Sequence, residues 1–452
     1  MRADGVSQAA IDVFSHYYEA LEAGETGLIP EDSIEPLISP THVTDVEVSD
    51  EAAKEALAKT VVVKLNGGLG TSMGMDKAKS LLEVKNGQTF LDLIVAQVLQ
   101  VRETYGVRLP LLLMNSFRTQ EDSLAALARH PEIATAGLEP DFVQNKEPKL
   151  LVSDLTPVSW PADPSLEWCP PGHGDIYTAL LASGMLESLI AAGYKYASVS
   201  NSDNLGAAPS PAIAGWFAAS GAPFAAELCR RTAADRKGGH IAVRKSDGRL
   251  ILREVAQTAP EEMDSFTDAD RHSYFNTNNL WFDLEQLHAA LTERGAVLGL
   301  PLIRNVKTVD PSEAASPEVF QIETAMGAAI EVFEGAQAIV VGRDRFLPVK
   351  TTNDLLLLRS DAYELEADGT LCLVAPEAPL VDLDSRYYKL VPDFEARFAN
   401  GAPSLRGARS LTVSGDWTFG PDVTVQGDAE LSDTGQAQRL PSGAHIGAPG
   451  LD

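Results

Sequence analysis

The chain has 452 residues, 44% of them hydrophobic and 22% charged, which predicts a globular protein of two or three domains with a large core. Its formal net charge of −28 argues against a broad basic surface, so we expect no nucleic-acid partner and no membrane partner. Three scattered cysteines, no apolar signal segment after Met1 and no apolar run of about 18 residues predict a cytoplasmic protein without a membrane span.

The first half of the chain predicts one helix, a connection and then alternating strands and helices. Apolar residues at helical spacing indicate a helix over residues 7–24, and residues 25–50, rich in Pro, Asp and Glu, are interpreted as a connecting segment. The elements expected next are a strand over 61–65, a strand over 81–84, a helix over 89–105, a strand over 109–114 and a helix capped by Thr119. This alternation predicts an α/β domain with a mostly parallel sheet and helices on both of its faces.

A glycine-dense turn follows the first predicted strand. Gly67, Gly68, Gly70 and Gly74 allow positive φ angles and a close approach of main-chain N–H groups to a bound anion. Lys79 comes shortly afterwards and supplies positive charge. The sequence therefore predicts a phosphate-binding loop, although a glycine-rich turn without a ligand is the alternative.

The spacing in this loop differs from two common phosphate-binding motifs. Gly68, Gly70 and Gly74 are separated by one residue more than a dinucleotide fingerprint allows. A P-loop needs glycine directly before Lys-Ser, and Ala78 stands there instead. A hydride-transferring oxidoreductase is therefore disfavoured.

A second strand of small residues, starting at Tyr196, is followed by Asp203. Ligands of open α/β sheets bind beyond the carboxyl ends of the strands, so we expect Asp203 and the glycine loop to share one crevice. After about residue 380 short alternating strands between glycines predict a β-solenoid or a small sandwich. The expected domains are a helical and connecting segment (1–50), a catalytic domain (51–380) and a C-terminal domain (381–452).

Eight sequence blocks in a fixed order carry a family resemblance. They are Lys64-Leu-Asn-Gly-Gly-Leu-Gly-Thr-Ser-Met-Gly74, Gln144-Asn-Lys-Glu-Pro-Lys-Leu150, Pro170-Pro-Gly-His-Gly-Asp175, Asn201-Ser-Asp-Asn-Leu-Gly206, Phe275-Asn-Thr-Asn-Asn-Leu-Trp281, Gln321-Ile-Glu-Thr-Ala-Met-Gly-Ala-Ala329, Phe346-Leu-Pro-Val-Lys-Thr-Thr-Asn-Asp354 and Tyr387-Tyr-Lys-Leu-Val-Pro-Asp-Phe394. With them the chain closely resembles the eukaryotic-type UTP–glucose-1-phosphate uridylyltransferases, also called UDP-glucose pyrophosphorylases.

The resemblance implies a fold, a reaction and a cofactor. The fold is a Rossmann-like, nucleotidyltransferase-A-like α/β domain followed by a small left-handed β-helix domain. The reaction is Mg²⁺-dependent transfer of a uridylyl group from UTP to glucose 1-phosphate, giving UDP-glucose and pyrophosphate by direct in-line displacement. Because the attacking phosphate is already anionic, catalysis consists of positioning and charge neutralisation.

The resemblance also implies roles for individual residues. The catalytic residues implied are Lys79, Lys350 and Asp203, with Asp203 also holding Mg²⁺. The nucleotide-binding residues implied are Leu65, Asn66, Gly67 and Gly68 through their main chains, Gln144 on uracil, and Gly172, where a side chain is expected to block the base. The sugar-phosphate residues implied are His173, Asn201, Glu254, Asn276, Asn278 and Glu323, with Asn276 and Asn278 on one face of a strand.

The sequence leaves alternatives open for most of these residues. An acceptor other than glucose 1-phosphate, such as another sugar 1-phosphate, or a non-catalytic sugar-nucleotide-binding protein fits the same fold. Without the resemblance, Asp203 reads as a turn cap, and Lys79 and Lys350 read as solvated strand-edge residues.

Two departures from the family pattern bear on the expectations. Lys77-Ala-Lys-Ser80 stands where the family usually has Gly-Pro-Lys-Ser. The chain also ends soon after the first solenoid-like strands, and we expect a monomer or a small homo-oligomer.

Overall fold

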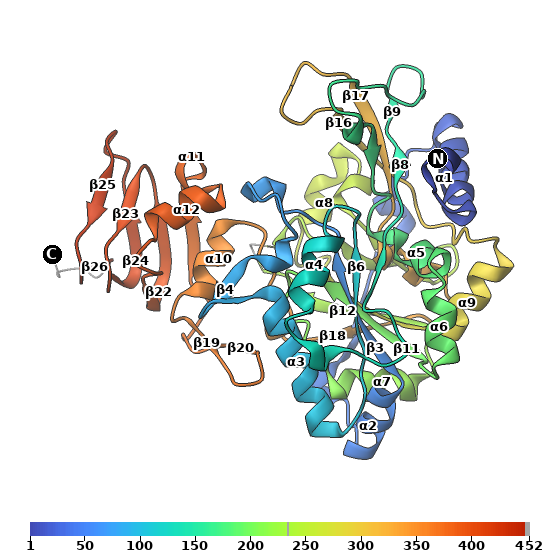
Figure 1. Cartoon of the computed structure of the whole chain (residues 1–452), viewed down its shortest axis with the longest axis horizontal. Helices are drawn as coiled ribbons and strands as arrows, with labels where there is room; N and C mark the ends of the chain where they lie inside the picture. The colour runs from blue at the N-terminus through green and yellow to red at the C-terminus, as the bar shows by residue number, and fades with distance from the viewer. Residues whose placement is uncertain (233–234, 448–452) are drawn as a thin grey trace.

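The computed structural model describes residues 1–232 and 235–447, and its centre is one large sheet. In those residues the sheet has 11 strands. Its main path runs β2 (Thr41–His42), β18 (Gln337–Val340), β12 (Phe224–Arg230), β15 (Tyr274–Asp283), β11 (Tyr196–Asn201), β3 (Thr60–Asn66), β6 (Leu111–Asn115) and β7 (Asp141–Val143). At one side β1 (Ile34–Pro36), β13 (His240–Arg244) and β14 (Leu250–Arg253) extend it (Figure 1).

The sheet is mixed and mostly parallel along its main path. Strands β11, β3, β6 and β7 are parallel to one another, as are β12, β18 and β2. Strand β15 lies between the two groups and is antiparallel to both β11 and β12. The prediction of a mostly parallel sheet is therefore confirmed, and β15 is the strand that the alternation pattern did not indicate.

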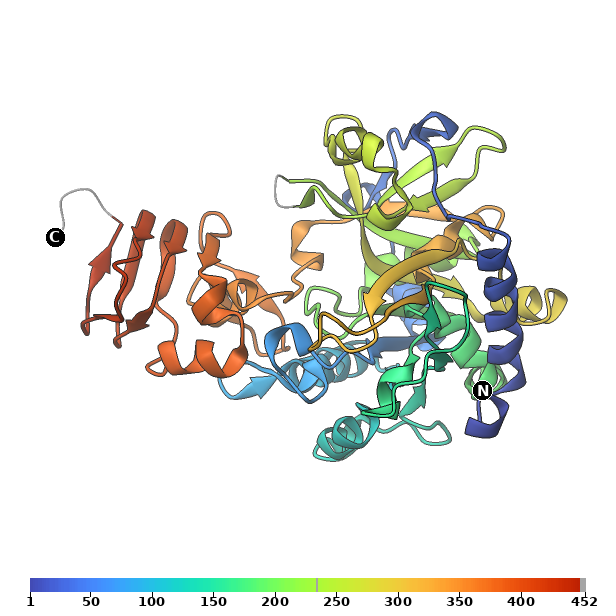
Figure 2. The same cartoon turned by 90° about the horizontal axis from the view of Figure 1, so that it is seen from above.

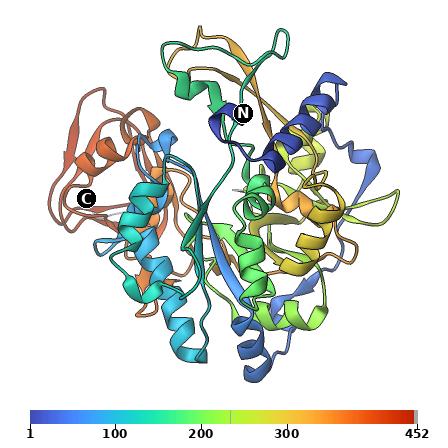
Figure 3. The same ribbon diagram turned by 45° about the vertical axis from the view of Figure 1, so that its right-hand side comes forward.

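Helices cover both faces of the sheet because successive side chains of each strand point to opposite sides. On β3, Val62 packs in a core with α2 (Asp50–Ala58), α3 (Phe90–Tyr105) and α7 (Pro211–Ser220). Val61 and Val63 pack in a second core with α5 (Ile176–Ala182), α6 (Met185–Ala191) and α9 (Leu284–Glu293). Figure 3 shows these two layers on either side of the central strands.

The N-terminal predictions are confirmed in part. Helix α1 (Gln8–Glu22) matches the predicted helix, and the side chain of Ser7 caps it. Within residues 25–50, interpreted as a connecting segment, the structure shows two short strands, β1 and β2, that pair with the sheet. Each of these short strands pairs with a strand from the middle or end of the chain, so no local periodicity marks them.

Two further local predictions are confirmed only in part. The strand predicted over 81–84 exists as β4 (Glu83–Lys85), but it pairs with β5 (Gln88–Thr89) in a small hairpin outside the central sheet. Thr119 stands at the N-cap position of α4 (Gln120–Leu127), but its hydroxyl accepts the N–H of Ser116 at 2.9 Å and makes no cap bond. Helix α3 begins as predicted, with Thr89 and Asp92 forming a capping box.

Smaller elements complete the fold around the sheet. A three-stranded sheet of β16 (Ile303–Thr308), β17 (Glu318–Glu323) and β9 (Leu150–Leu151) projects beside α1 (Figure 1). The remaining elements before the C-terminal part are β8 (Glu147–Pro148), β10 (Trp168–Cys169), α8 (Met263–Thr267), α10 (Thr352–Arg359), β19 (Tyr363–Leu365) and β20 (Leu371–Leu373). Over the described ranges, none of the helices is long and apolar enough to cross a bilayer.

The C-terminal part consists of parallel strands at one end of the molecule (Figure 2). Strands β21 (Leu380–Leu383), β22 (Ser404–Val413), β24 (Thr424–Leu431) and β26 (His445–Ile446) form one parallel sheet, and β23 (Trp417–Phe419) pairs in parallel with β25 (Gln438–Leu440). Helices α11 (Ser385–Tyr388) and α12 (Val391–Arg397) pack against them. The β-helix and the three domain boundaries stay predictions, and one hydrophobic cluster runs from α3 into β22 and β24.

A pair of leucines on neighbouring strands tests how much this C-terminal core contributes to stability. Leu411 on β22 is 0% exposed and Leu380 on β21 is 69% exposed. We expect Leu411→Ala to lower the free energy of unfolding by about 2–5 kcal/mol, since it removes buried methyl groups and leaves a cavity. The control Leu380→Ala is expected to stay within about 0.5 kcal/mol of the parent in urea denaturation. Equal effects of the two substitutions would contradict this packing.

Candidate active site

The carboxyl ends of four neighbouring parallel strands bring the predicted residues together. The chain leaves β3 into Gly67 and Gly68, β7 into Gln144, and β11 into Asp203. Gln144 is held in register by its N–H, which donates to the carbonyl of Asn115 at the end of β6 (2.8 Å). This edge is where open α/β sheets bind their ligands.

Two adjoining hollows lie along this edge. We call the first the loop hollow; it is lined by Leu65, Gly67, Gly68, Lys79, Gln144 and Gly172, with Glu323 at its side. The second, the strand hollow, is lined by Lys237, Gly239, Glu254, Asn276, Asn278 and Lys350. His173, Asn201 and Asp203 line both hollows. Their volumes of about 330 and 290 Å³ lie at the lower end of the range of small-molecule sites.

The glycine loop presents main chain to the loop hollow. Gly70 and Gly74 have φ angles of 63° and 74°, which a residue with a side chain rarely adopts. The N–H of Lys79 donates to the carbonyl of Gly68 (3.1 Å) and closes the loop. A Cβ at Gly67 would lie 2.9 Å from the amide of Gln144, so glycine lets the loop and this amide approach each other.

Lys79, Asp203 and Lys350 converge where the two hollows meet. The Lys79 Nζ atom lies 2.7 Å from Asp203 Oδ2, and both side chains are largely buried. The main-chain carbonyl of Asp203 accepts the N–H of Val349 (3.2 Å), the residue before Lys350. Lys350 itself is exposed and lines the strand hollow. The structure thus brings these three residues together, in two connected hollows where the sequence suggested one pocket.

His173 is oriented by a backbone donor. The N–H of Met326 donates to Nδ1 of the ring (3.0 Å), so Nε2 carries the proton of the neutral imidazole. The surrounding protein lowers the pKa of His173 from 6.5 to about 4, because burial disfavours the charged ring. His173 therefore offers a neutral N–H donor at the junction of the two hollows.

Gly172 lines the loop hollow as predicted, but the physical reason differs from the one expected. Its φ of 78° lies in the left-handed region. A Cβ there would lie 2.7 Å from the carbonyl oxygen of Thr324 and 3.0 Å from Cβ of Glu323. Glycine is thus required by contact with the protein's own backbone, and its expected contact with a base stays a prediction.

Asn276 and Asn278 both line the strand hollow, as their spacing predicted. The pairing of β15 with β12 is irregular here, and Asn278 has a φ of 63°. The Asn278 amide reaches Asn201 at 3.4 Å, across the gap between β15 and β11. Bulges of this kind are common beside active sites because they redirect side chains.

Two carboxyl groups lie at the far sides of the hollows. Burial raises the pKa of Glu254 to about 7, although Lys350 and Arg231 lower it. Its carboxyl group lies against Gly239, where a Cβ would come within 2.6 Å of Oε1. Glu323, at the end of β17, accepts the Asn305 amide at 3.1 Å and faces the loop hollow.

Asn66 is the one predicted site residue that lines neither hollow. Its side chain is 1% exposed and donates to Asn115 and Ser123, both at 2.8 Å. It therefore ties β3 to β6 and α4 beneath the loop. A main-chain contact of Asn66 with a nucleotide stays a prediction.

Sequence reasoning missed a group of buried charges behind the site. Glu227 accepts the guanidinium of Arg345 at 2.7 and 2.9 Å and the indole N–H of Trp281 at 2.9 Å. Desolvation raises the pKa of Glu227, but the charge and hydrogen bonds of Arg345, with the bonds from Trp281 and Asn279, outweigh it and hold the pKa below its usual value. Lys64 donates to Ser200 and to the carbonyl of Ala207, both at 2.8 Å, and burial lowers the pKa of Lys64 to about 7. Lys64 and Trp281 stand in two of the sequence blocks, and Arg345 directly precedes a third, which was the available signal.

The described residues hold no cluster of three or more His, Cys, Asp or Glu side chains suited to a metal. Asp203 alone offers a carboxylate at the junction of the hollows. Mg²⁺ is commonly bound by one or two carboxylates together with substrate phosphates and water. The donor set therefore fits a cation that arrives with phosphates and does not fit an all-protein metal site.

Comparison with known proteins assigns the family. The family described as UTP–glucose-1-phosphate uridylyltransferase matches residues 11–426. The chain belongs to this family. The uridylyltransferase of Hordeum vulgare is 40% identical over 404 residues (87% of this chain, 82% of that protein), and the Saccharomyces cerevisiae protein is 40% identical over 396 (86% and 77%).

A mutant UDP-glucose pyrophosphorylase of Leishmania major, solved in complex with UDP-glucose, is 44% identical in sequence to this chain. It superposes with a TM-score of 0.92, covering 98% of this chain and 96% of the other. The predicted family and the mixed α/β fold are confirmed. As a UTP–glucose-1-phosphate uridylyltransferase by family, the chain is an enzyme that makes UDP-glucose.

The low pKa of His173 gives a pH prediction. We expect the ring to stay neutral between pH 5 and 8, observed as a histidine signal that does not titrate near 6.5 in NMR spectra and disappears in His173→Gln. Between about pH 4 and 6.5 the unfolded chain binds the extra proton, so the contribution of His173 to stability rises with pH across that window. A His173 signal that titrates near 6.5 would contradict the burial argument.

Proposed function

We propose that the enzyme transfers UMP from UTP to glucose 1-phosphate with Mg²⁺, by direct in-line attack and with release of pyrophosphate. A phosphate oxygen of glucose 1-phosphate forms a bond to the α-phosphorus of UTP. The bond from that phosphorus to the bridging oxygen of pyrophosphate breaks, and no proton is transferred. The attacking oxygen is already anionic, so the protein needs no nucleophile and no general base.

The convergence of Lys79, Asp203 and Lys350 at the junction of the hollows carries the proposal. Two anionic reactants repel each other, and a protein of net charge −28 has to place positive charge locally. Lys79 faces the loop hollow and Lys350 faces the strand hollow. Each ammonium group therefore approaches the reacting phosphates from its own side, where charge develops in the transition state.

Asp203 is proposed to hold Mg²⁺. Its Oδ2 atom now accepts Lys79, so cation binding replaces or shares that contact. When bound, Mg²⁺ supplies further positive charge to phosphate oxygens. Freed from Asp203, the Lys79 ammonium is available to phosphate.

The loop hollow is proposed to hold the uridine nucleotide. Gly67 and Gly68 present main chain, and the Gln144 amide, packed on Gly67, has a donor and an acceptor for the uracil edge. Leu65, Asn66 and Gly172 are proposed to complete this part. A Cβ at Gly68 would meet no atom within 4 Å, which leaves the peptide there open to a phosphate.

The strand hollow is proposed to hold the hexose phosphate. Asn201, Asn276 and Asn278 offer amides to hydroxyl groups, and Glu254 offers a carboxyl group. His173, through Nε2–H, is proposed to donate to a phosphate oxygen, and Glu323 to accept a hydroxyl from the side of the loop hollow. Lys237, which the sequence analysis did not single out, adds a cation to this wall.

We further propose a cytoplasmic enzyme that is a monomer or a small homo-oligomer. All three cysteines are free, which suits a reducing compartment. The C-terminal parallel strands are proposed to form a short β-helix.

A product assay tests the proposed function. UTP, Mg²⁺ and glucose 1-phosphate are expected to give pyrophosphate and UDP-glucose in equal amounts, and EDTA is expected to stop turnover. Galactose 1-phosphate and N-acetylglucosamine 1-phosphate, each offered in turn, test the sugar. A better rate with either of them, or full turnover in EDTA, would contradict the corresponding part of the proposal.

Lys350 allows a specific test of charge neutralisation. We expect Lys350→Ala to lower kcat by about 10²–10³, the usual effect of removing one group that stabilises developing charge. The far-UV circular dichroism spectrum should not change, because the Lys350 side chain is exposed. The hydrogen bond from Lys350 to Asp354 uses the main-chain N–H, which alanine keeps. Lys54→Ala, an exposed lysine on α2, serves as the control with unchanged kcat. Near-normal turnover of the Lys350 variant would remove this residue from the reaction.

A further inference from the structure

We propose that Asp175 is a positioning residue for uridine recognition: its buried carboxylate fixes the turn after Gln144 and so sets the direction of the Gln144 amide. The inference deepens the proposed function and rests on it, because it assumes that Gln144 reads the base. Asp175 itself contacts no ligand in this account.

The first observation is an unusual pair of hydrogen bonds. The main-chain N–H of Asn145 donates to Asp175 Oδ2 at 2.6 Å, and the Asn145 side-chain amide donates to Asp175 Oδ1 at 2.8 Å. One carboxylate thus holds both the backbone and the side chain of the residue that follows Gln144. Bonds to a charged acceptor are shorter and stronger than those between neutral groups.

The second observation is what Asp175 does not do. It stands at the N-cap position of α5, where an aspartate usually accepts an N–H of its own helix. Its side chain makes no such cap bond. The carboxylate is directed to a loop 30 positions earlier in the chain, so a helix-capping role does not explain it.

Asp175 also belongs to the turn that carries Gly172 and His173. This turn is fixed by bonds from the N–H of Gly174 to the Thr324 carbonyl (2.8 Å) and from the N–H of Thr324 to the Pro171 carbonyl (3.0 Å). Through Asp175, the Gln144 loop is therefore tied to the turn on the opposite side of the loop hollow. The other constraints on Gln144 are the bond of its main chain to β6 and the contact of its amide with Gly67.

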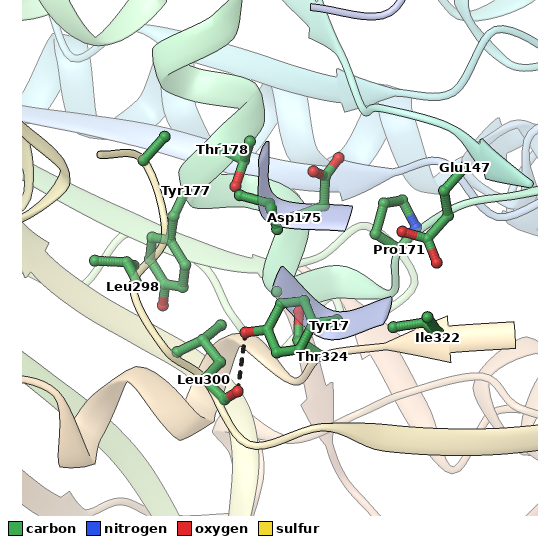
Figure 4. Close-up of a pocket in the computed structure, with 13 residues that line it drawn as sticks. Tyr17, Glu147, Pro171, Asp175, Tyr177, Thr178, Leu298, Leu300, Ile322 and Thr324 are labelled. Carbon is green, nitrogen blue, oxygen red and sulfur yellow. Dashed lines mark hydrogen bonds between the residues drawn. The ribbon is translucent and has the colours of Figure 1, made fainter. Parts of the chain in front are cut away.

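The surroundings of Asp175 favour its two hydrogen bonds from Asn145. Its side chain borders a small cavity together with Tyr17 of α1, Tyr177 of α5 and Glu147 of β8 (Figure 4). Tyr17 closes the cavity by donating to the carbonyl of Leu300 at 2.9 Å. A carboxylate in this position has few water molecules to bond and keeps its two Asn145 donors.

A pH dependence follows from this burial. Desolvation raises the pKa of Asp175 to about 7, although the Asn145 bonds lower it. The ionisable groups around it are Glu147 on β8, Glu323 on β17, His173 in the same turn, Tyr17 on α1 and Tyr177 on α5. Burial raises the pKa of Glu147 and lowers that of His173, which disfavours a charge on either group. As pH falls through about 7, Asp175 gains a proton and loses an acceptor for Asn145.

The test measures binding of UDP-glucose to the whole enzyme by calorimetry, since this ligand has no group that titrates near neutral pH. In Asp175→Asn we expect affinity for UDP-glucose at pH 8 to fall about tenfold or more, while the weak affinity for ADP-glucose changes little. KM for UTP should rise more than kcat falls. Wild-type affinity should decline from pH 8 to pH 6, and this decline should be absent in the variant.

Two further variants separate positioning from stability. Asn145→Ala removes the side-chain donor to Asp175 and is expected to lower the preference for UDP-glucose over ADP-glucose as Asp175→Asn does. The double variant Asp175→Asn/Asn145→Ala should show no added loss. Asp283→Asn is the matched control: Asp283 is equally buried at 4% and caps α9 by accepting the N–H of Gln286 (3.0 Å). It should lower stability and leave the discrimination between uridine and adenosine ligands unchanged.

The outcomes distinguish this inference from the proposed function. The inference is overturned, and the proposed function is not, if Asp175→Asn and Asn145→Ala both keep the wild-type affinity for UDP-glucose, the wild-type preference over ADP-glucose and the wild-type pH profile. An equal loss of UDP-glucose and ADP-glucose binding would also overturn it, since that result indicates a general collapse of the hollow. A wild-type enzyme that neither binds UDP-glucose nor makes it would overturn the proposed function. Should Asp175→Asn fail to fold, Asn145→Ala decides the matter by the same measurements.

Discussion

The ion pair between Lys79 and Asp203 is the contact on which the arrangement of the site depends. It joins two loops 124 positions apart in the sequence, one after β3 and one after β11, at an Nζ–Oδ2 distance of 2.7 Å. Because the chain carries a net charge of −28, positive charge at this edge of the sheet has to come from individual lysines such as Lys79. The same loop that carries Asp203 is bonded through its main chain to the segment of Lys350, which links the two hollows.

Buried polar groups behind the hollows keep these loops in place. Lys64 holds Ser200 and Ala207 on both sides of the Asp203 turn, and Arg345 donates to Glu227 beneath the irregular part of β15. Removing one member of such a pair leaves an uncompensated buried charge, which is much more costly than the pair itself. Charged groups that line neither hollow therefore help to hold the loops of the site in place.

The sequence predicted the frame and most of the site for local reasons. Strand and helix periodicity placed β3, α3, β6 and α1, and glycine spacing with nearby lysines located the loop hollow. The ordered blocks supplied Gln144, His173, Asn201 and Lys350, which no periodicity marks, and all of them line the hollows. Strands β1 and β2 were missed because their partners lie far away in the chain. Residues 81–84 were expected as a strand, but the local pattern did not indicate that β4 pairs only with the adjacent β5.

The sequence by itself determined the residue types: glycines where the backbone turns sharply, lysines that line the hollows, and amides on alternate positions of β15. Only the tertiary structure decided their directions. It turned Asn66 away from the hollows, placed the backbone of Thr324 against Gly172, and directed Asp175 to Asn145 instead of to its own helix. Each of these depends on contacts between segments distant in the chain, and the burial that shifts a pKa or orients a side chain exists only once those segments have packed together.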